Sequence, residues 1–257
     1  MEFKLLENAI FIGDCHENKN KHFFLNFLKF LDEKNPKIPQ IFLMGDIFDF
    51  LTNTDFVKKF YEKEIELLNK LSKKYEIYYL EGNHDFNLSK IFKNIKVFKN
   101  SAQPVFFTDE FNHKIALAHG DIFLPFFTQK ILLFLRNKVF LKIMNLIDKI
   151  LYYEISKAIL KSQENKILYK KFINFNKYIE KKLLNYNADY VIEGHYHQDV
   201  FFKFEKKSYF NLNSFAVEPK IYKVKFENKN LILKPFEYNY KNFIKENNDK
   251  TLCIWLW

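Results

Sequence analysis

The chain has 257 residues, of which 48% are hydrophobic and 28% charged, and it contains no low-complexity tract. Such a length supports a substantial core, and such a composition excludes an intrinsically disordered protein. The apolar runs, of which residues 131–135 are an example, are too short to cross a bilayer. The first residues lack the basic start and long apolar stretch of a signal peptide, so we expect a cytoplasmic protein.

The formal net charge is +10, which favours anionic partners such as nucleic acid, acidic lipid or phosphorylated metabolites. The only two cysteines, Cys15 and Cys253, stand far apart in the sequence and give no disulfide framework. A reducing compartment fits this cysteine usage. The location of the positive charge along the chain must decide among the anionic partners.

Short apolar runs alternate with helical patterns in the first half of the chain. Residues 9–12, 41–44 and 77–80 have the pattern of buried strands, whereas residues 23–31 and 56–71 carry apolar side chains at helical spacing. Strands and helices in alternation predict a largely parallel sheet with helices on its faces.

The second half contains further strand patterns. Residues 105–108 and 115–118 are typical of a strand pair, and residues 190–192 of another short strand. Residues 200–236 are strand-like around two polar breaks. The last residues, 252–257, are apolar, and their pattern does not say whether they pack on the core.

Residues 122–182 differ from the rest of the chain. They contain no glycine and a single proline, Pro125, and their apolar residues recur at helical spacing. They hold thirteen Lys and Arg against four Asp and Glu, which is nine of the ten net positive charges. We therefore predict one domain over residues 1–257 that carries a basic helical insert at 122–182.

The chain has only five glycines, and each follows a predicted strand: Gly13, Gly45, Gly82, Gly120 and Gly194. Each also adjoins side chains that can bind metals. In open α/β sheets, ligands bind at the carboxyl ends of the strands, where these turns lie. Each turn alone is more often an ordinary one with a capping residue. Together, however, burying so many Asp and His side chains without a cation would be costly.

Five motifs in this order resemble the calcineurin-like metallophosphoesterase superfamily: Asp14-x-His16, Gly45-Asp46, Gly82-Asn83-His84-Asp85, His119 after an apolar strand, and Gly194-His195-x-His197. The resemblance covers residues 8–200. It implies an α/β fold of four layers, a β-sandwich of two mixed sheets flanked by helices. The strand pattern alone does not distinguish this fold from a doubly wound sheet.

The resemblance also implies a set of metal ligands. Asp14, His16 and His197 would hold one divalent cation, Asn83, His119 and His195 would hold a second, and Asp46 would bridge both. We expect Mn²⁺, with Fe, Zn²⁺ or Mg²⁺ as alternatives, because carboxylates and imidazoles suit these ions. Two such ions lower the pKa of a bridging water and clamp the phosphoryl oxygens.

Two further residues of the third motif are given catalytic roles by the resemblance. His84 would face the substrate phosphate and protonate the leaving oxygen, and Asp85 would orient it. The alternative for His84 is a hydrogen bond that only shapes the turn. Asp49 and Asp121 are expected to support or cap the site, and the side chain of Cys15 to point away from it.

The insert must select the substrate. Its residues between 131 and 151 are apolar almost all round the helix, and with the basic charge they predict an interfacial cap. A cap at this point resembles the UDP-2,3-diacylglucosamine pyrophosphatases of lipid A synthesis. These enzymes release UMP and 2,3-diacylglucosamine 1-phosphate at the cytoplasmic face of the Gram-negative inner membrane, and their cap shelters the acyl chains.

The resemblance gives the expected substrate, a lipid-linked nucleotide sugar, and an expected partner, an anionic membrane surface. Asn165 and Lys166 would contact the sugar phosphate, unless they lie on a solvated helix face. There is one departure, because the best-known branch of that family has Asn-Arg-Asp where this chain has Asn83-His84-Asp85.

Two other functions remain open at this point. A nuclease or nucleotide phosphodiesterase would use the basic insert to grip phosphates. Nucleic acid is nevertheless not the partner we expect, because the basic residues are mixed with long aliphatic runs that a nucleic-acid groove does not need. The third alternative is a binding module without catalysis, which a missing metal ligand would support. No ligand of the motif set is missing, and no protein partner is implied.

Overall fold

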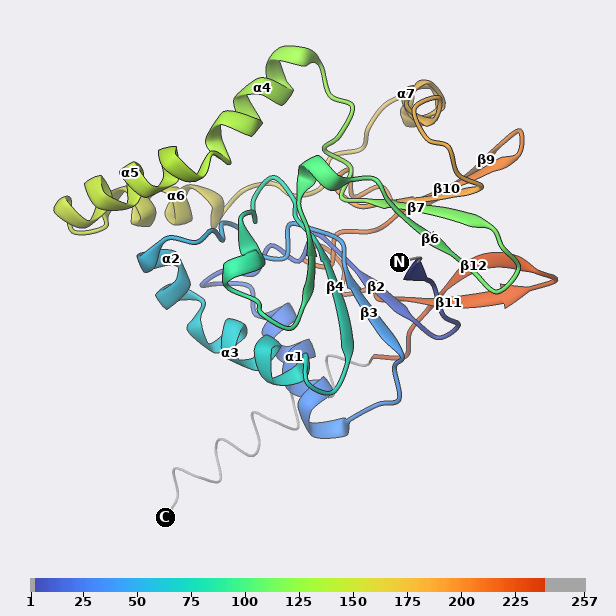
Figure 1. Ribbon diagram of the computed structural model, residues 1–257, viewed down its shortest axis with the longest axis horizontal. Helices are drawn as coiled ribbons and strands as arrows, with labels where there is room; N and C mark the ends of the chain where they lie inside the picture. Colours follow the sequence, from blue (N-terminus) through green and yellow to red (C-terminus); the bar gives the residue numbers. More distant parts are fainter. Residues whose placement is uncertain (1–2, 239–257) are drawn as a thin grey trace.

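The computed structural model describes residues 3–238 of the chain (Figure 1). The apolar residues 252–257 and Cys253 lie outside the described residues. Over the described range, the strands form two six-stranded sheets, which we call sheet I and sheet II.

Sheet I contains, in chain order, β2 (Ile10–Ile12), β3 (Gln40–Leu43), β4 (Glu76–Leu80), β5 (Lys96–Phe98), β11 (Tyr222–Glu227) and β12 (Asn230–Pro235). Its strand order is β12-β11-β2-β3-β4-β5. Strands β2 to β5 are parallel, and β11 is antiparallel to both of its neighbours. The three strands predicted near the N-terminus are confirmed and lie side by side.

Sheet II contains β1 (Phe3–Lys4), β6 (Val105–Thr108), β7 (Lys114–Ala118), β8 (Tyr190–Glu193), β9 (Val200–Phe204) and β10 (Lys207–Asn211). Its strand order is β1-β6-β7-β8-β10-β9. The predicted strand pair is confirmed, since β6 and β7 are antiparallel neighbours. Strand β7 is parallel to β8, so their carboxyl ends reach the same edge of the sheet.

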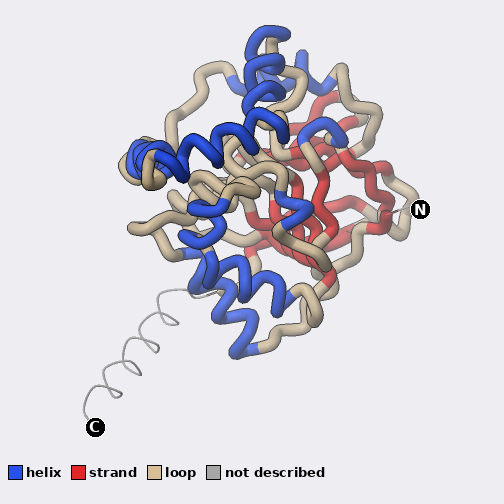
Figure 2. The backbone as a smooth tube through the Cα atoms, turned by 60° about the vertical axis from the view of Figure 1, so that its left-hand side comes forward, coloured by secondary structure: helices blue, strands red, loops and turns tan. Residues whose placement is uncertain are grey.

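The flanking helices are α1 (Phe23–Lys34), α2 (Asp55–Phe60) and α3 (Glu62–Leu71) beside sheet I, and α7 (Phe175–Leu183) beside sheet II. Figure 1 shows α1 and α3 below the strands and α7 above them, and in Figure 2 the helices lie around the strands. Alternate residues of β2 face different layers: Ile10 and Ile12 pack with the helices, and Phe11 packs between the sheets. The predicted four-layer sandwich is confirmed, and the doubly wound alternative is excluded.

The helix predicted over residues 56–71 is divided into α2 and α3. Tyr61 leaves helical geometry at the junction, with φ −103° and ψ 25°. Its side chain is buried, and its hydroxyl donates to the carbonyl oxygen of Glu17 at 2.9 Å. A buried tyrosine hydroxyl requires such a partner, which a pattern of apolar residues does not reveal.

The predicted insert contains α4 (Phe126–Leu135), α5 (Lys138–Ile150), α6 (Glu154–Gln163) and most of α7. Helices α4 to α6 stand at one edge of the sandwich in Figure 1, whereas α7 belongs to the layer on sheet II. Helix α5 is tied to the start of α2, because Asn145 and Lys149 both contact Asp55. The limits of the insert, 122–182, stay a prediction. Within residues 3–238, every helix falls short of the length and apolar character needed to cross a membrane.

A buried ion pair joins α7 to the turn after β7. The Lys182 ammonium donates to Glu193 at 2.7 Å and to the Gly120 carbonyl at 2.6 Å. The Glu193 carboxylate also accepts hydrogen bonds from the hydroxyls of Tyr186 and Tyr209. The pair therefore anchors a helix to the residue that follows His119.

Replacing Lys182 by methionine is expected to lower the free energy of unfolding by about 3–5 kcal/mol, because Glu193 would stay buried without its counter-ion. Urea denaturation measures this change. Lys181→Met is the matched control, since Lys181 is the adjacent residue and is exposed; its effect should stay within about 0.5 kcal/mol. Equal effects of the two substitutions would contradict the assigned role.

Candidate metal centre

The turns that carry the predicted ligands meet at one edge of the sandwich. They follow β2, β3, β4, β7 and β8, whose carboxyl ends share that edge. Two groups form there, and within each group the potential ligand atoms lie within 4.8 Å of one another: Asp14, His16 and His197 in one, and Asp46, His119 and His195 in the other. Residues separated by up to 183 positions are thus neighbours, as the motif order predicted.

The two groups are joined to each other. His197 Nε2 lies 3.0 Å from Asp14, and His119 Nε2 lies 3.4 Å from Asp46. The backbone N–H of His195, from the second group, donates to the Asp14 carboxylate at 2.9 Å. Asn83 Oδ1 lies 3.3 Å from His119 Nε2. The structure therefore brings together all seven side chains of the predicted ligand set.

Five of these seven residues have a backbone conformation that L-residues rarely adopt. Their φ angles are 50° at Asp14, 44° at His16, 49° at Asp46, 65° at His195 and 57° at His197. Each such residue costs about 1–3 kcal/mol, and clusters of them are typical of ligand sites. The local backbone is therefore shaped for these side chains to converge rather than for stability.

Two glycines make this convergence sterically feasible. A Cβ atom on Gly82 would lie 2.2 Å from Asp46 Oδ1, and one on Gly194 would lie 2.4 Å from Asp14 Oδ2. Any other residue at either position would displace a carboxylate of the site. The packing of the site carboxylates therefore requires glycine at these two positions.

Hydrogen bonds fix the ring orientation of the site histidines. His119 Nδ1 donates to the Met44 carbonyl at 2.9 Å, and His197 Nδ1 donates to the Leu168 carbonyl. In both rings, Nε2 is therefore the nitrogen that faces a carboxylate of the site, and the neighbouring carboxylates Asp46 and Asp14 raise the pKa of His119 and His197 respectively. His16 Nδ1 faces Asp49 at 3.1 Å, which is the supporting role expected for Asp49.

Two buried nitrogen atoms of the site have no hydrogen-bond partner among the described residues, His16 Nε2 and His195 Nδ1. Burial, with the neighbouring charge of His119, lowers the pKa of His195 to about 4, so its imidazole is neutral at pH 7. Unpaired imidazole nitrogens beside two carboxylates suit a divalent metal ion. Cys15 packs in the core below and supplies no thiolate. The residues present therefore fit a pair of metal ions.

The model of the Calcineurin-like phosphoesterase family matches residues 8–199, which is most of the chain. This chain belongs to the calcineurin-like phosphoesterase family. The predicted resemblance is confirmed, and membership implies divalent metal ions at the two groups described above. The expected class, a metal-dependent phosphoesterase, agrees with the family.

Curated relatives of this phosphoesterase carry the name UDP-2,3-diacylglucosamine hydrolase. One from Coxiella burnetii (strain RSA 331 / Henzerling II) is 30% identical over 117 residues, 45% of this chain and 48% of the relative. Another from Shewanella loihica is 27% identical over 114 residues, 44% of this chain and 47% of the relative. The match thus spans about half the length of these relatives. A solved structure of an archaeal phosphodiesterase aligns with 89% of this chain and 99% of its own at 12% identity, with a TM-score of 0.45.

His84 of this phosphoesterase lies beside the predicted metal ligands. Its Nδ1 donates to the Asp49 carbonyl at 2.8 Å, and its Nε2 lies 3.2 Å from the Lys166 ammonium. Burial lowers the pKa of His84, so the free ring accepts a hydrogen bond from Lys166 through Nε2. Its backbone N–H donates to Asp46 at 2.8 Å. The residue is placed at the site, and its proton-transfer role stays a prediction.

Asp85 has a different position from the one expected. Its carboxylate accepts hydrogen bonds from the backbone N–H groups of Asp46, Ile47 and Gly82 and from the hydroxyl of Tyr79. Burial and the nearby Asp46 raise the pKa of Asp85 to about 7. The His84 ring is oriented by the Asp49 carbonyl instead. Asp85 therefore fixes two turns of the site, and the expectation that it orients His84 is corrected.

Arg136 is a site residue that the sequence analysis missed. It lies between α4 and α5, and its Nη2 donates to the Gly82 carbonyl at 2.9 Å and to Asp121 at 2.6 Å. Its guanidinium also lies 5.9 Å from the ring centre of Phe86. It thereby connects the helices of the insert to the turn that carries Asn83. The sequence did contain one signal that could have singled this residue out: Arg136 is the only arginine among the 41 Lys and Arg residues.

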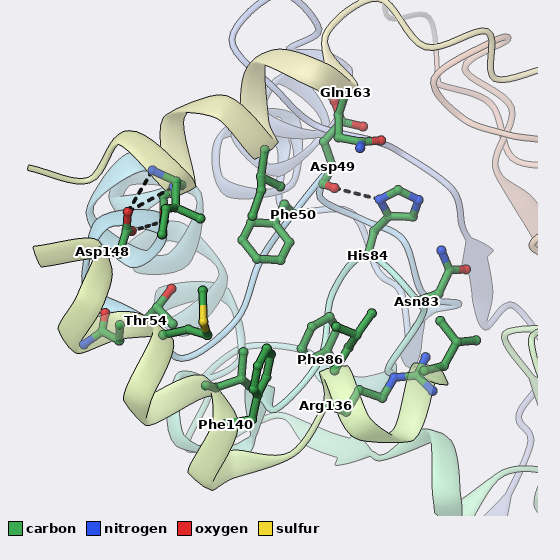
Figure 3. Close-up of a pocket in the computed structure, with 18 residues that line it drawn as sticks. Asp49, Phe50, Thr54, Asn83, His84, Phe86, Arg136, Phe140, Asp148 and Gln163 are labelled. Carbon is green, nitrogen blue, oxygen red and sulfur yellow. Dashed lines mark hydrogen bonds between the residues drawn. The ribbon is translucent and has the colours of Figure 1, made fainter. Parts of the chain in front are cut away.

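A cavity of about 360 Å³ lies beneath α4 to α6 and reaches the metal centre (Figure 3). Its lining is mostly apolar, with Phe50, Phe86 and Phe140 around its middle, and it meets the site at Asn83 and His84. Lys166 lines a second hollow on the other side of His84. Asn165 is exposed and lines neither space, so the structure does not bring it to the site.

Removing divalent cations is expected to lower the thermal unfolding midpoint by about 5 °C. The reason is that ions present at 100 times their Kd stabilise the folded protein by about 2.7 kcal/mol. Adding Mn²⁺ to chelated protein should restore the midpoint. Differential scanning calorimetry measures both steps. The His119→Ala variant should show a smaller response, and an equal response in that variant would place the ions elsewhere.

Proposed function

We propose that this phosphoesterase hydrolyses the pyrophosphate bond of UDP-2,3-diacylglucosamine to UMP and 2,3-diacylglucosamine 1-phosphate. The observation that carries the proposal is the apolar cavity that opens directly onto Asn83 and His84. A phosphoesterase for small polar substrates has no need of an apolar space next to its metal ligands. A diacylated sugar phosphate needs such a space, because each buried CH₂ contributes about 0.8 kcal/mol.

The relatives support the same substrate. Their printed name is UDP-2,3-diacylglucosamine hydrolase, and the match to them covers about half of each chain. The α4–α6 region supplies the acyl site in our proposal, and Arg136 connects that region to the metal-site turns. His84 stands where the best-known branch has an arginine, and in our proposal Lys166, 3.2 Å from His84 Nε2, supplies the positive charge at this point.

The residues of the centre divide into three roles in this proposal. Asp14, His16 and His197 hold one cation, whereas Asn83, His119 and His195 hold the other, with Asp46 between them. Bound divalent cations, Mn²⁺ in our proposal, supply Lewis acidity and an activated water for attack on phosphorus. Asp46 presents one carboxylate oxygen to this centre, and its other oxygen accepts a hydrogen bond from the His84 backbone N–H at 2.8 Å.

His84 and Lys166 act on the leaving side. The His84 ring is held by the Asp49 carbonyl, so its Nε2 keeps a fixed direction. Lys166 Nζ, 3.2 Å from that nitrogen, places a positive charge where phosphate oxygens would lie. We propose that the substrate phosphate draws Lys166 away from His84 Nε2, that this nitrogen then takes up a proton from water, and that His84 passes the proton to the departing oxygen while Lys166 contacts the phosphate.

The helices over the cavity also present an apolar and basic outer surface. Phe127 is 80% exposed, Val139 67% and Ile150 69%. Lysines lie between them along α4 and α5, in the stretch that carries most of the net charge. We propose that this surface rests on an anionic membrane at the cytoplasmic face, where the substrate chains are held. Co-sedimentation with phosphatidylglycerol vesicles should fall in a Phe127→Asp variant, and equal sedimentation would contradict this placement.

The decisive experiment is an assay of UMP release from UDP-2,3-diacylglucosamine by the purified protein with Mn²⁺. We expect release that the Asp46→Asn variant lacks. Hydrolysis of simple nucleotides or nucleic acid without release of UMP from the diacylated substrate would favour the phosphodiesterase alternative. Failure to bind any divalent cation would favour a binding module.

A further inference from the structure

A segment without helix or strand crosses the metal centre between α6 and α7. The carbonyl of Leu168 accepts from His197 Nδ1. The side chain of Gln198 holds the same segment twice, since its Nε2 donates to the Lys170 carbonyl and its Oε1 accepts from the Phe172 N–H, both at 3.0 Å. The turn that carries His197 therefore fixes the path of residues 166–172, which we call the crossing segment.

A hollow of about 270 Å³ lies between the crossing segment and the metal centre. It shares Asn83 and His84 with the apolar cavity, so the two spaces meet at the site where the bond would be cleaved. The rest of its lining differs in chemistry, because Lys166, Lys170 and Phe172 face it in place of aliphatic side chains.

The two lysines of the hollow provide unneutralised positive charge. Over residues 3–238, neither Lys166 nor Lys170 takes part in an ion pair, although many exposed lysines of the same range do, such as Lys70 and Lys149. Two ammonium groups without a carboxylate partner, beside a site for phosphoryl chemistry, suit the oxygens of a phosphate group.

Phe172 adds a flat apolar surface in a fixed orientation. Its ring lies edge-on to Phe175 and Tyr178, at 5.4 and 5.2 Å between ring centres, and nearly parallel to Tyr196 at 6.2 Å. Tyr196 is itself held, because its hydroxyl contacts Lys182 and the Gly120 carbonyl. Phe172 is nevertheless 41% exposed, so a ring fixed by three aromatic neighbours still offers a surface to the hollow.

We propose that this hollow binds the nucleoside 5′-monophosphate half of the substrate, with Lys166 and Lys170 on its phosphate and the base against Phe172. The inference rests on the proposed function, and it assigns the two spaces to the two halves of one molecule. The apolar cavity takes the acylated sugar, the hollow takes the nucleotide, and the pyrophosphate lies between them at Asn83 and His84. Every nucleobase can stack on an aromatic ring, so Phe172 would accept any nucleoside monophosphate and would not select uracil.

Titration calorimetry of the Mn²⁺-loaded protein with UMP, ribose 5-phosphate and inorganic phosphate tests the assignment. UMP should bind most tightly. Phe172→Leu keeps an apolar side chain but removes the ring, and it should weaken UMP about tenfold while leaving inorganic phosphate unchanged. Lys170→Ala should weaken all three ligands. Phe172→Tyr should bind UMP as the unmodified protein does.

Ile173→Ala is the matched control, because Ile173 is the next residue, is 81% exposed and does not line the hollow. It should leave UMP binding unchanged. The assignment is overturned if Phe172→Leu binds UMP normally, or if UMP binds no better than inorganic phosphate. Those results can coincide with normal UMP release from the diacylated substrate, which would leave the proposed function intact. Conversely, ring-dependent UMP binding without hydrolysis of that substrate would refute the proposed function and retain the nucleotide site.

Discussion

Replacing Asp46 by asparagine is expected to lower kcat/KM for the pyrophosphate substrate at least ~10³-fold. The substitution weakens the binding of the metal ions, and their charge stabilises the transition state by several kcal/mol. The substitution keeps the shape of the side chain and an oxygen that can accept from the His84 N–H. It removes the negative charge that lies 3.4 Å from His119 Nε2. Metal content, measured by mass spectrometry, should fall together with the rate.

The matched control for this prediction is Asp32→Asn. Asp32 lies away from the centre and pairs with Lys70 at 2.7 Å. The same chemical change there should leave the rate and the metal content within twofold, since exposed pairs contribute less than about 1 kcal/mol. If Asp46→Asn kept the activity of the Asp32→Asn variant, Asp46 would not be part of the metal centre.

Placing an arginine at Met144 is expected to lower kcat/KM for the diacylated substrate about 100-fold. Met144 lines the apolar cavity, and a charged side chain there would occupy space and bring water into it. Loss of burial of a few CH₂ groups amounts to about 3 kcal/mol, which corresponds to this factor. The hydrolysis of a small chromogenic phosphodiester, measured with the same protein, should change less than threefold.

Met144→Leu controls for the position, since the two side chains have similar volumes and such exchanges are well tolerated. It should retain most of the activity on both substrates. Equal losses on both substrates in Met144→Arg would indicate a disturbed metal centre. Unchanged activity on the diacylated substrate would exclude the cavity as the acyl site.

The sequence predicted the parts of the site that depend on local pattern. A strand followed by glycine and a metal-binding side chain is a local signal, and it located Asp14, Asp46 and His195 correctly at one edge of the sandwich. The order of the motifs then supplied the fold, which strand patterns alone left open between two architectures. Asp49 could be assigned a supporting role because it lies three residues from Asp46, in the same turn.

Residues that act across long distances could not be assigned in this way. The partners of Arg136 are Gly82 and Asp121, which neighbour it only in the folded chain. Asp85 is adjacent to His84 in sequence, yet its carboxylate turns inward to the backbone of Asp46 and Ile47. A motif fixes which residues are present, whereas tertiary packing fixes the direction of each side chain.

The most direct test of the account is a crystal structure of the protein grown with Mn²⁺, with anomalous diffraction recorded at the manganese absorption edge. We predict two peaks about 3.5–4 Å apart. One should lie among Asp14, His16 and His197, and the other among Asn83, His119 and His195, with Asp46 in contact with both. A single peak, or peaks away from these side chains, would contradict the central claim that the strand-end turns form a two-metal centre.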